Sequence, residues 1–209
     1  MELIRKYFPG LSAVQDEQLA RLGELYPEWN TKINVISRKD IQNLYINHVL
    51  HSLCIARFWG ELAPGTTVMD LGTGGGFPGI PLAVMYPGVK FHLIDRIAKK
   101  LRVATDIAEQ IGLHNVTFQH GDSGECHERF DYVVSRAVMP LDKLVRLVTR
   151  NIVRCGRPGN RYAPGLVCLK GGDLTEESAG VQYPVVEFEL AEFIPEDAYD
   201  TKKLVYVPI

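Results

Sequence analysis

The chain has 209 residues, 46% of them hydrophobic, which is enough to bury the core of one ordinary domain with an appendage. The net charge of −2 excludes a broad basic surface, so any contact with nucleic acid depends on local patches. There is no apolar run of the ~20 residues that a membrane span needs, no signal-peptide core, and no C-x-x-C pair among the four cysteines. We therefore expect a soluble, cytoplasmic protein without a disulfide framework or a zinc site.

Two helices are expected before the first strand. Apolar residues recur at helical spacing over residues 11–29, and Ser12 followed by Gln15 is the pattern of a capping box at the start of that helix. A turn then leads into a second helix over residues 40–62, which ends before a Pro-Gly pair. The first 64 residues are thus predicted to form a helical extension.

Residues 65–209 alternate between strand and helix patterns, which predicts an α/β, Rossmann-like domain around a mostly parallel sheet with helices on both faces. Seven strands are expected, at residues 67–71, 89–94, 116–119, 130–135, 165–169, 185–190 and 204–207. Helices are expected at 80–85, 97–111 and 141–153. Only a short link without a helix separates the last two strands, so we expect them to close the sheet as an antiparallel hairpin.

The most informative stretch is residues 68–81. A short apolar run ends in Asp70 and is followed by glycines at 72, 74, 75, 76 and 79 before a helix-like segment resumes. Glycines allow sharp turns and a close approach of a ligand to the main chain, and a helix start offers free N–H groups. Pro78 and Pro81 suit the first turn of that helix. The stretch predicts a nucleotide-type site.

Two ligand classes fit this loop. A G-x-G-x-x-G fingerprint begins at Gly74, and Asp95 lies about 20 residues on, where a dinucleotide site carries its ribose-binding acid. The same segment reads D-x-G-x-G-x-G from Asp70, which resembles motif I of S-adenosylmethionine-dependent methyltransferases. A carboxylate there suits the ammonium group of that ligand. The glycines alone leave both readings open.

Polar features are expected to meet at one edge of the sheet. The carboxyl ends of the predicted strands bring together the 72–79 loop, Asp95, the 121–125 loop and Ser135-Arg136. Ligands of open α/β sheets bind at this edge, near the point where the strand order reverses. The sequence therefore predicts one crevice lined by these four segments.

Several motifs carry a resemblance that extends over nearly the whole chain. They are Asn34-Val-Ile-Ser, His48-x-x-x-Ser52, the Asp70–Pro81 stretch, Asp95-x-x-x-Lys-Lys100, Phe130-Asp-Tyr-Val-Val-Ser-Arg-Ala137 and Leu169-Lys-Gly171. In these motifs the chain resembles the bacterial 16S rRNA guanine-N7 methyltransferases, also called the glucose-inhibited division protein B family. The resemblance implies a seven-stranded S-adenosylmethionine-dependent methyltransferase fold with an N-terminal helical extension.

The resemblance also implies the reaction and its participants. S-Adenosylmethionine is the expected cofactor, N7 of a specific guanine the expected methyl acceptor, and 16S rRNA in the small ribosomal subunit the expected partner. We expect a monomer with no membrane contact. The cofactor contacts expected from the resemblance and from motif I are Gly72, Gly74, Gly76, Phe77, Asp95, Asp122, Ser123, Gly124 and Arg136.

The chain departs from the family pattern at two places. The 121–125 loop has Asp122-Ser-Gly-Glu where the family usually has Arg-(Ala/Val)-Glu, which leaves backbone contacts to adenine but no side chain at 124. His51 and Asn47 stand where many members have Asp and Arg.

Guanine N7 presents a lone pair at the base edge, so attack on a methyl group needs no general base. Catalysis then depends on positioning and on stabilisation of moving charge. Arg136 is the first candidate, as a donor to the cofactor or to guanine O6; the alternative is a surface ion pair. Asn34 is expected at the base edge or as a turn residue, and His48 at the substrate or in the core. His48 and His51 lack a third ligand, so no metal is expected.

Basic residues in two regions are candidates for RNA phosphates. Lys99 and Lys100 at a helix start, and Lys170 after a strand, are either phosphate ligands or parts of a solvated face. A segment with Gly and Pro but no acid contains Arg150, Arg154, Arg157 and Arg161, and it is the kind of local patch that a protein of slightly negative charge needs to hold RNA.

Two other functions remain compatible with these patterns. One is an NAD-dependent oxidoreductase that uses the fingerprint starting at Gly74. The other is a non-catalytic RNA-binding ribosome assembly factor that has lost turnover through the altered 121–125 loop.

Overall fold

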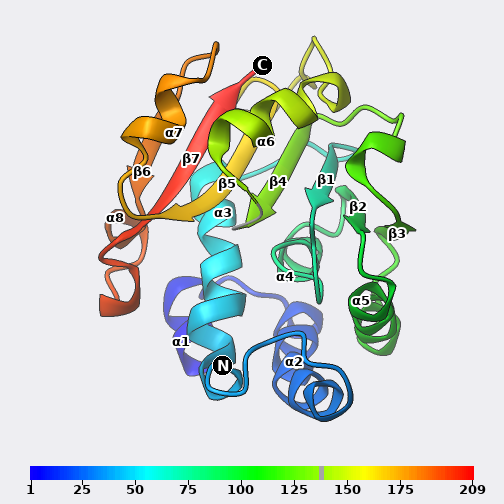
Figure 1. The fold of residues 1–209 in the computed structure, drawn as a ribbon. Coiled ribbons are helices and arrows are strands. Elements are labelled where there is room, and N and C mark those ends of the chain that lie inside the picture. The colour runs from blue at the N-terminus through cyan, green and yellow to red at the C-terminus, as the bar shows by residue number, and fades with distance from the viewer. Residues whose placement is uncertain (137–138) are drawn as a thin grey trace.

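The computed structural model describes residues 1–136 and 139–209, with the backbone alone at Ser123. Its seven-stranded sheet has the order β3-β2-β1-β4-β5-β7-β6 and carries helices on both faces (Figure 1). The strands are β1 Thr67–Leu71, β2 Lys90–Asp95, β3 Val116–His120, β4 Tyr132–Arg136, β5 Gly165–Gly171, β6 Val186–Glu189 and β7 Lys202–Pro208. The pairs from β3 to β5 are parallel, and β7 runs antiparallel between β5 and β6. The predicted sheet and its closing antiparallel pair are confirmed.

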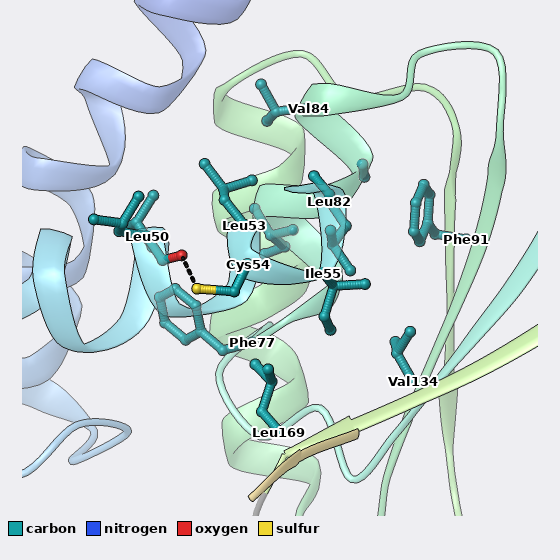
Figure 2. Packing of buried hydrophobic residues seen from close by; sticks show 14 of the residues in the cluster. Leu50, Leu53, Cys54, Ile55, Phe77, Leu82, Val84, Phe91, Val134 and Leu169 are labelled. Carbon is teal, nitrogen blue, oxygen red and sulfur yellow. Dashed lines mark hydrogen bonds between the residues drawn. The ribbon is translucent and has the colours of Figure 1, made fainter. Parts of the chain in front are cut away.

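Period-two side-chain alternation divides the core into one cluster on each sheet face. Val134 lies in the first core cluster, with residues of α2 to α5, whereas Val133 lies in the second, with residues of α6. Figure 2 shows part of the first cluster, where Phe77 lies near Leu50 and Cys54. The central parallel strands β1, β4 and β5 therefore bury both of their faces.

The helices are α1 Glu2–Tyr7, α2 Ala13–Lys32, α3 His51–Trp59, α4 Gly79–Met85, α5 Ala98–Gln110, α6 Leu141–Val148, α7 Thr175–Ala179 and α8 Leu190–Phe193. The predicted capping box of α2 is present, since Ser12 Oγ accepts from the Gln15 backbone and Gln15 Oε1 accepts from the Ser12 backbone. Pro81 lies in the first turn of α4, as expected, and Pro78 is its N-cap. Within the described residues, none of these helices has the length and apolarity to cross a bilayer.

Three element predictions are wrong in detail. The helix expected at 40–62 is instead a 3₁₀ turn Ile41–Asn43, a π-helix Tyr45–Leu50 and then α3, which ends before Gly60. The helix expected at 141–153 ends at Val148 and continues as a 3₁₀ turn, Thr149–Asn151. The link between the last two strands does contain a helix, because α8 and a 3₁₀ turn Asp197–Tyr199 lie there.

The N-terminal segments pack on the sheet domain rather than standing apart. Ile4, Leu22 and Leu53 share the first core cluster with strand residues. Two polar contacts also join the chain ends, since Lys6 Nζ and Tyr7 Oη both donate to Glu196 Oε1, at 2.7 and 2.6 Å.

Candidate active site

The glycine loop joins β1 to α4 at the carboxyl edge of the sheet. Gly72, Gly74 and Gly76 have φ values of 70°, 57° and 104°, which L side chains rarely adopt. The hydroxyl of Tyr26, a buried residue of α2, donates to the Gly75 carbonyl at 2.7 Å and so ties the loop to that helix. The loop conformation thus depends on glycine at several positions at once, as its sequence predicts.

Asp70 anchors this loop from the end of β1. Its fully buried carboxylate accepts at Oδ2 from Thr73 Oγ1 at 2.6 Å and from Gly79 N at 2.7 Å. Oδ1 has no hydrogen-bond partner among the described residues. Burial raises the pKa of Asp70 to about 7. A cationic group placed beside Oδ1 would stabilise the charged form.

Asp95 holds the other side of the loop from the end of β2. Its Oδ2 accepts from Gly74 N at 2.7 Å and its Oδ1 from Ile97 N at 2.8 Å. A crevice of about 370 Å³, which we name the glycine-loop pocket, lies here between the ends of β1, β2 and β3; its walls include Gly72, Asp95, Lys100, Asp122 and Met139. Gly72, Asp95 and the 121–125 loop meet here as predicted, whereas Ser135 and Arg136, which were expected in the same crevice, do not line this pocket.

The 121–125 loop is built around a carboxylate. Asp122 Oδ1 accepts from Gly124 N at 2.9 Å, and Asp122 Oδ2 lies 3.7 Å from Arg96 Nη1. The side chain of Ser123 lies outside the described part of the chain. The loop therefore contributes Gly121 and Asp122 to the walls of the glycine-loop pocket.

Arg136 ends β4 and points into a polar network formed by the π-helix. Its Nη1 donates to the Asn47 carbonyl at 3.2 Å and its Nη2 to His48 Nδ1 at 3.0 Å. The guanidinium carbon lies 5.3 Å from the centroid of the Phe77 ring. No carboxylate oxygen of a described residue lies within 4.0 Å of this guanidinium, so the alternative of a surface ion pair does not apply.

His48 lies between Arg136 and Asp40 and is hydrogen-bonded to both. Because Nδ1 accepts from Arg136, the neutral ring carries its hydrogen on Nε2, which donates to Asp40 Oδ2 at 2.5 Å. Asn47 Nδ2 also donates to Asp40, at 2.5 Å. Burial, followed by the charge of Arg136, lowers the pKa of His48. Single π-turns occur often at functional sites, and here one aims a carbonyl and an imidazole at the same arginine.

The lowered pKa of His48 predicts a pH-dependent stability. In the unfolded chain this group takes up a proton near its ordinary pKa of 6.5, whereas the folded chain resists protonation, so the free energy of unfolding should fall as pH drops below 6.5. Urea titrations over a pH series should show a weaker fall for His48→Gln than for the native chain. Parallel curves for the two proteins would contradict this prediction.

Asn34 is exposed in the turn after α2, and its side chain makes no hydrogen bond with the described residues. The turn-forming role expected for it belongs to Asn30, whose Oδ1 accepts from Val35 N at 2.9 Å and Ile36 N at 3.0 Å. A Cβ at Gly75 would lie 2.9 Å from Val35 Cβ, so this turn does rest on the glycine loop.

The basic candidates divide between two edges of the sheet. Lys99 is exposed at the start of α5, and Lys100 contributes to the glycine-loop pocket. Lys170 is instead held in place, because its Nζ donates to the Met139 carbonyl at 2.7 Å and to Glu177. Binding of a phosphate by Lys170 would require that ion pair to open.

The arginine segment lies at the opposite, amino edge. Arg154, Arg157 and Arg161 are exposed in the connection that leads into the start of β5, close to the C-terminus at the top of the view (Figure 1). Arg157 Nε lies 3.7 Å from the carboxylate of Asp131, which precedes β4. These arginines are thus remote from the glycine-loop pocket.

A second pocket of about 430 Å³, here named the Arg136 pocket, was not expected from the sequence. It opens at the ends of β4, β5 and β7, and Met139 belongs to both pockets. His51 and Lys202 line it, although neither was among the predicted site residues. Asp40, the partner of His48, was also missed, since no local pattern connects it to a site.

The chain matches the family model described as GidB: rRNA small subunit methyltransferase G over residues 15–163. It is 54% identical, over 209 residues, to the ribosomal RNA small subunit methyltransferase G of Phocaeicola vulgatus, with 100% of this chain and 99% of that protein covered. The protein of the same name from Bacteroides thetaiotaomicron is also 54% identical, over 100% of both chains.

Among solved structures, a SAM-dependent methyltransferase from Aquifex aeolicus has the same fold, with a TM-score of 0.53, 17% sequence identity, and coverage of 82% of this chain and 98% of that one. The sheet order and this likeness establish the Rossmann-like, seven-stranded fold of S-adenosylmethionine-dependent methyltransferases, here with N-terminal helices added. Together with the match of the family model and the full-length relatives, they lead to one conclusion: the chain belongs to the rRNA small subunit methyltransferase G family.

Proposed function

We propose that this chain is an S-adenosylmethionine-dependent methyltransferase that methylates N7 of a specific guanine in 16S rRNA of the small ribosomal subunit. The observation that carries the proposal is the pair of pockets at the carboxyl edge of the parallel strands, one beside the glycine loop and one beside Arg136, which share Met139, in a chain of this family. The first suits a cofactor and the second a base. We further propose that the protein acts as a cytoplasmic monomer.

The residues around the glycine loop fit this cofactor. The unpartnered, buried Oδ1 of Asp70 suits an ammonium group. The cofactor-binding set is then Gly72, Gly74, Gly76, Phe77, Asp95, Asp122, Ser123, Gly124 and Arg136. Asp95 retains unused lone pairs for ribose hydroxyls, because each of its oxygens accepts one backbone hydrogen bond.

When bound, the cofactor supplies a methyl group on a sulfonium; the methyl–sulfur bond breaks as the bond to guanine N7 forms. The protein does not have to remove a proton, since N7 already carries a free lone pair. Arg136, oriented by His48 and the Asn47 carbonyl, donates to guanine O6 next to the reacting atom. The Phe77 ring helps to hold Arg136 in place, because the guanidinium carbon lies over it at 5.3 Å and an aromatic face attracts cations. Asn34 approaches the base from the turn on the glycine loop.

RNA contacts are proposed on both edges of the sheet. Lys99 and Lys100 lie beside the glycine-loop pocket and suit phosphates close to the target nucleotide. Arg154, Arg157 and Arg161 would hold a separate RNA segment at the amino edge. Neutralising several phosphates makes binding strongly salt-dependent. Lys170 would bind an RNA phosphate only after its ion pair with Glu177 opens.

The proposal is tested by transfer of tritiated methyl from S-adenosylmethionine to small subunits that lack the modification, followed by mapping of the labelled base. We expect label at N7 of one guanine and none on subunits that already carry the methyl group. Label elsewhere would overturn the substrate assignment. Cofactor and RNA binding without transfer would instead favour the assembly-factor alternative, and tight binding of NAD the oxidoreductase.

A further inference from the structure

His51, which lines the Arg136 pocket, carries a ring nitrogen that no other described residue uses. His51 is only 8% exposed, and its ring stacks on Tyr199 with centroids 5.7 Å apart. The ring is hydrogen-bonded to the backbone of Asn47, while Nε2 has no partner among the described residues. In the tautomer that carries its hydrogen on Nδ1, the neutral ring presents a bare lone pair at Nε2. Burial lowers the pKa of His51 well below its ordinary value, so the ring stays neutral.

The same pocket offers donors that are not neutralised. Arg136 uses two of its five N–H groups on Asn47 and His48, which leaves three. Lys202 lies with Nζ 5.3 Å from the Tyr199 ring centroid, and no carboxylate oxygen of a described residue is within 4.0 Å of it. By contrast, the other two charged groups in this pocket, Lys170 and Glu177, are paired with each other.

An acceptor next to donors is the complement of one purine edge. Guanine presents the O6 acceptor beside its N1–H and N2–H₂ donors. Adenine presents an amino donor beside an N1 acceptor, so the hydrogen bonds at positions 6 and 1 are reversed, and adenine has no donor at position 2. Sites that leave buried polar groups unpaired with the wrong ligand discriminate strongly against it. Burial of His51 Nε2 makes such an unpaired state costly here.

We propose that His51 and Lys202 determine base specificity in this chain: His51 Nε2 accepts from the N–H edge of guanine, and Lys202 together with Arg136 donates to its O6. The inference rests on the proposed function, and it names the groups that select the base at that same site. Neither residue transfers the methyl group; both position the base and exclude adenine.

The first test compares four variants in methyl transfer to unmodified small subunits. His51→Leu and Lys202→Met should each lower kcat/KM about 10-fold or more, with S-adenosylmethionine affinity, measured by calorimetry, within about twofold of the native value. His51→Gln should recover most of the loss, because an amide oxygen can replace Nε2 as acceptor. Lys203→Met is the matched control, since Lys203 is the next residue of β7 and pairs with Glu187 and Glu189 instead.

Native kcat/KM in both His51→Leu and Lys202→Met would overturn the inference, as would equal losses in Lys202→Met and Lys203→Met. Failure of His51→Gln to recover activity in a folded, cofactor-binding protein would assign His51 a packing role and overturn its part in selection. If His51→Leu does not fold, Lys202→Met and the nucleotide test below still decide.

The second test does not depend on methyl transfer. With S-adenosylhomocysteine present, saturation-transfer NMR should detect binding of guanosine 5′-monophosphate to the native protein and weaker binding, by about 10-fold, of adenosine 5′-monophosphate. Lys202→Met should reduce this preference. Preference for the guanine nucleotide without any methyl transfer would refute the proposed function but would support base selection by this pocket. Equal binding of both nucleotides would refute base selection by His51 and Lys202.

Discussion

Methyl transfer to small ribosomal subunits is expected to fall by about 10²–10³-fold in Arg136→Ala, the range that follows loss of one preorganised donor at a reacting centre. Arg136 is the one described side chain that contacts the π-helix at both Asn47 and His48 and also faces the Phe77 ring. Its removal deletes the donor to O6 and leaves His48 Nδ1 without its partner. The measurement is single-turnover transfer at saturating cofactor.

The chain should remain folded in this variant, with a loss of about 1–3 kcal/mol from the two unpaired acceptors. Arg136→Lys should recover little activity, because an ammonium cannot satisfy a carbonyl, an imidazole and a base with the planar geometry of guanidinium. Arg146→Ala is the control, since Arg146 is exposed on α6 and its ion pair among the described residues is with Asp142 of the same helix, at 3.8 Å. Near-native transfer by Arg136→Ala would remove this residue from the site.

Gly79→Ala is expected to abolish cofactor binding and to destabilise the fold by about 1–3 kcal/mol. Helix propensity alone predicts the opposite, a gain of up to about 1 kcal/mol, because Gly79 is the first residue of α4. A Cβ there, however, would lie 2.7 Å from Asp70 Oδ2 and 2.8 Å from two carbons of Leu93. Both neighbours are fully buried and have nowhere to move. The clash therefore outweighs the propensity.

Calorimetric titration with S-adenosylmethionine and urea unfolding measure the two effects in Gly79→Ala. Gly10→Ala is the matched control, because a Cβ at Gly10 meets no atom within 4 Å and its φ lies outside the left-handed region. Native affinity in Gly79→Ala would show that the Asp70–Gly79 contact does not shape the site.

Local patterns were sufficient for the sheet and the glycine loop. Short apolar runs marked the strands, and the Ser12–Gln15 pair marked the start of α2. The six residues of α1 and the four of α8 were missed, because fewer than two turns give no visible helical period.

Contacts between distant residues explain what could not be predicted at the site. The π-helix replaced an ordinary helix where Asn47 and His48 meet Arg136, which lies 88 positions further along the chain than His48. No local spacing encodes such a contact. The same holds for Asp40 as partner of His48 and for the approach of Lys202 to His51. Asn34 was considered as a turn residue, but Asn30 makes the turn contacts; an asparagine suits a turn at either position, and only the fold decides which one forms it.

The contacts between the two chain ends have a consequence for synthesis of the protein. Lys6 bonds to Glu196 across 190 positions, and the Tyr199 hydroxyl donates to the Ile46 carbonyl within the π-helix. Such distant contacts form late in folding. During translation the glycine loop leaves the ribosome long before Tyr199 and Lys202 do. A nascent chain therefore contains the residues of the glycine-loop pocket first. It gains Lys202, and with it the complete Arg136 pocket, only when translation is almost complete.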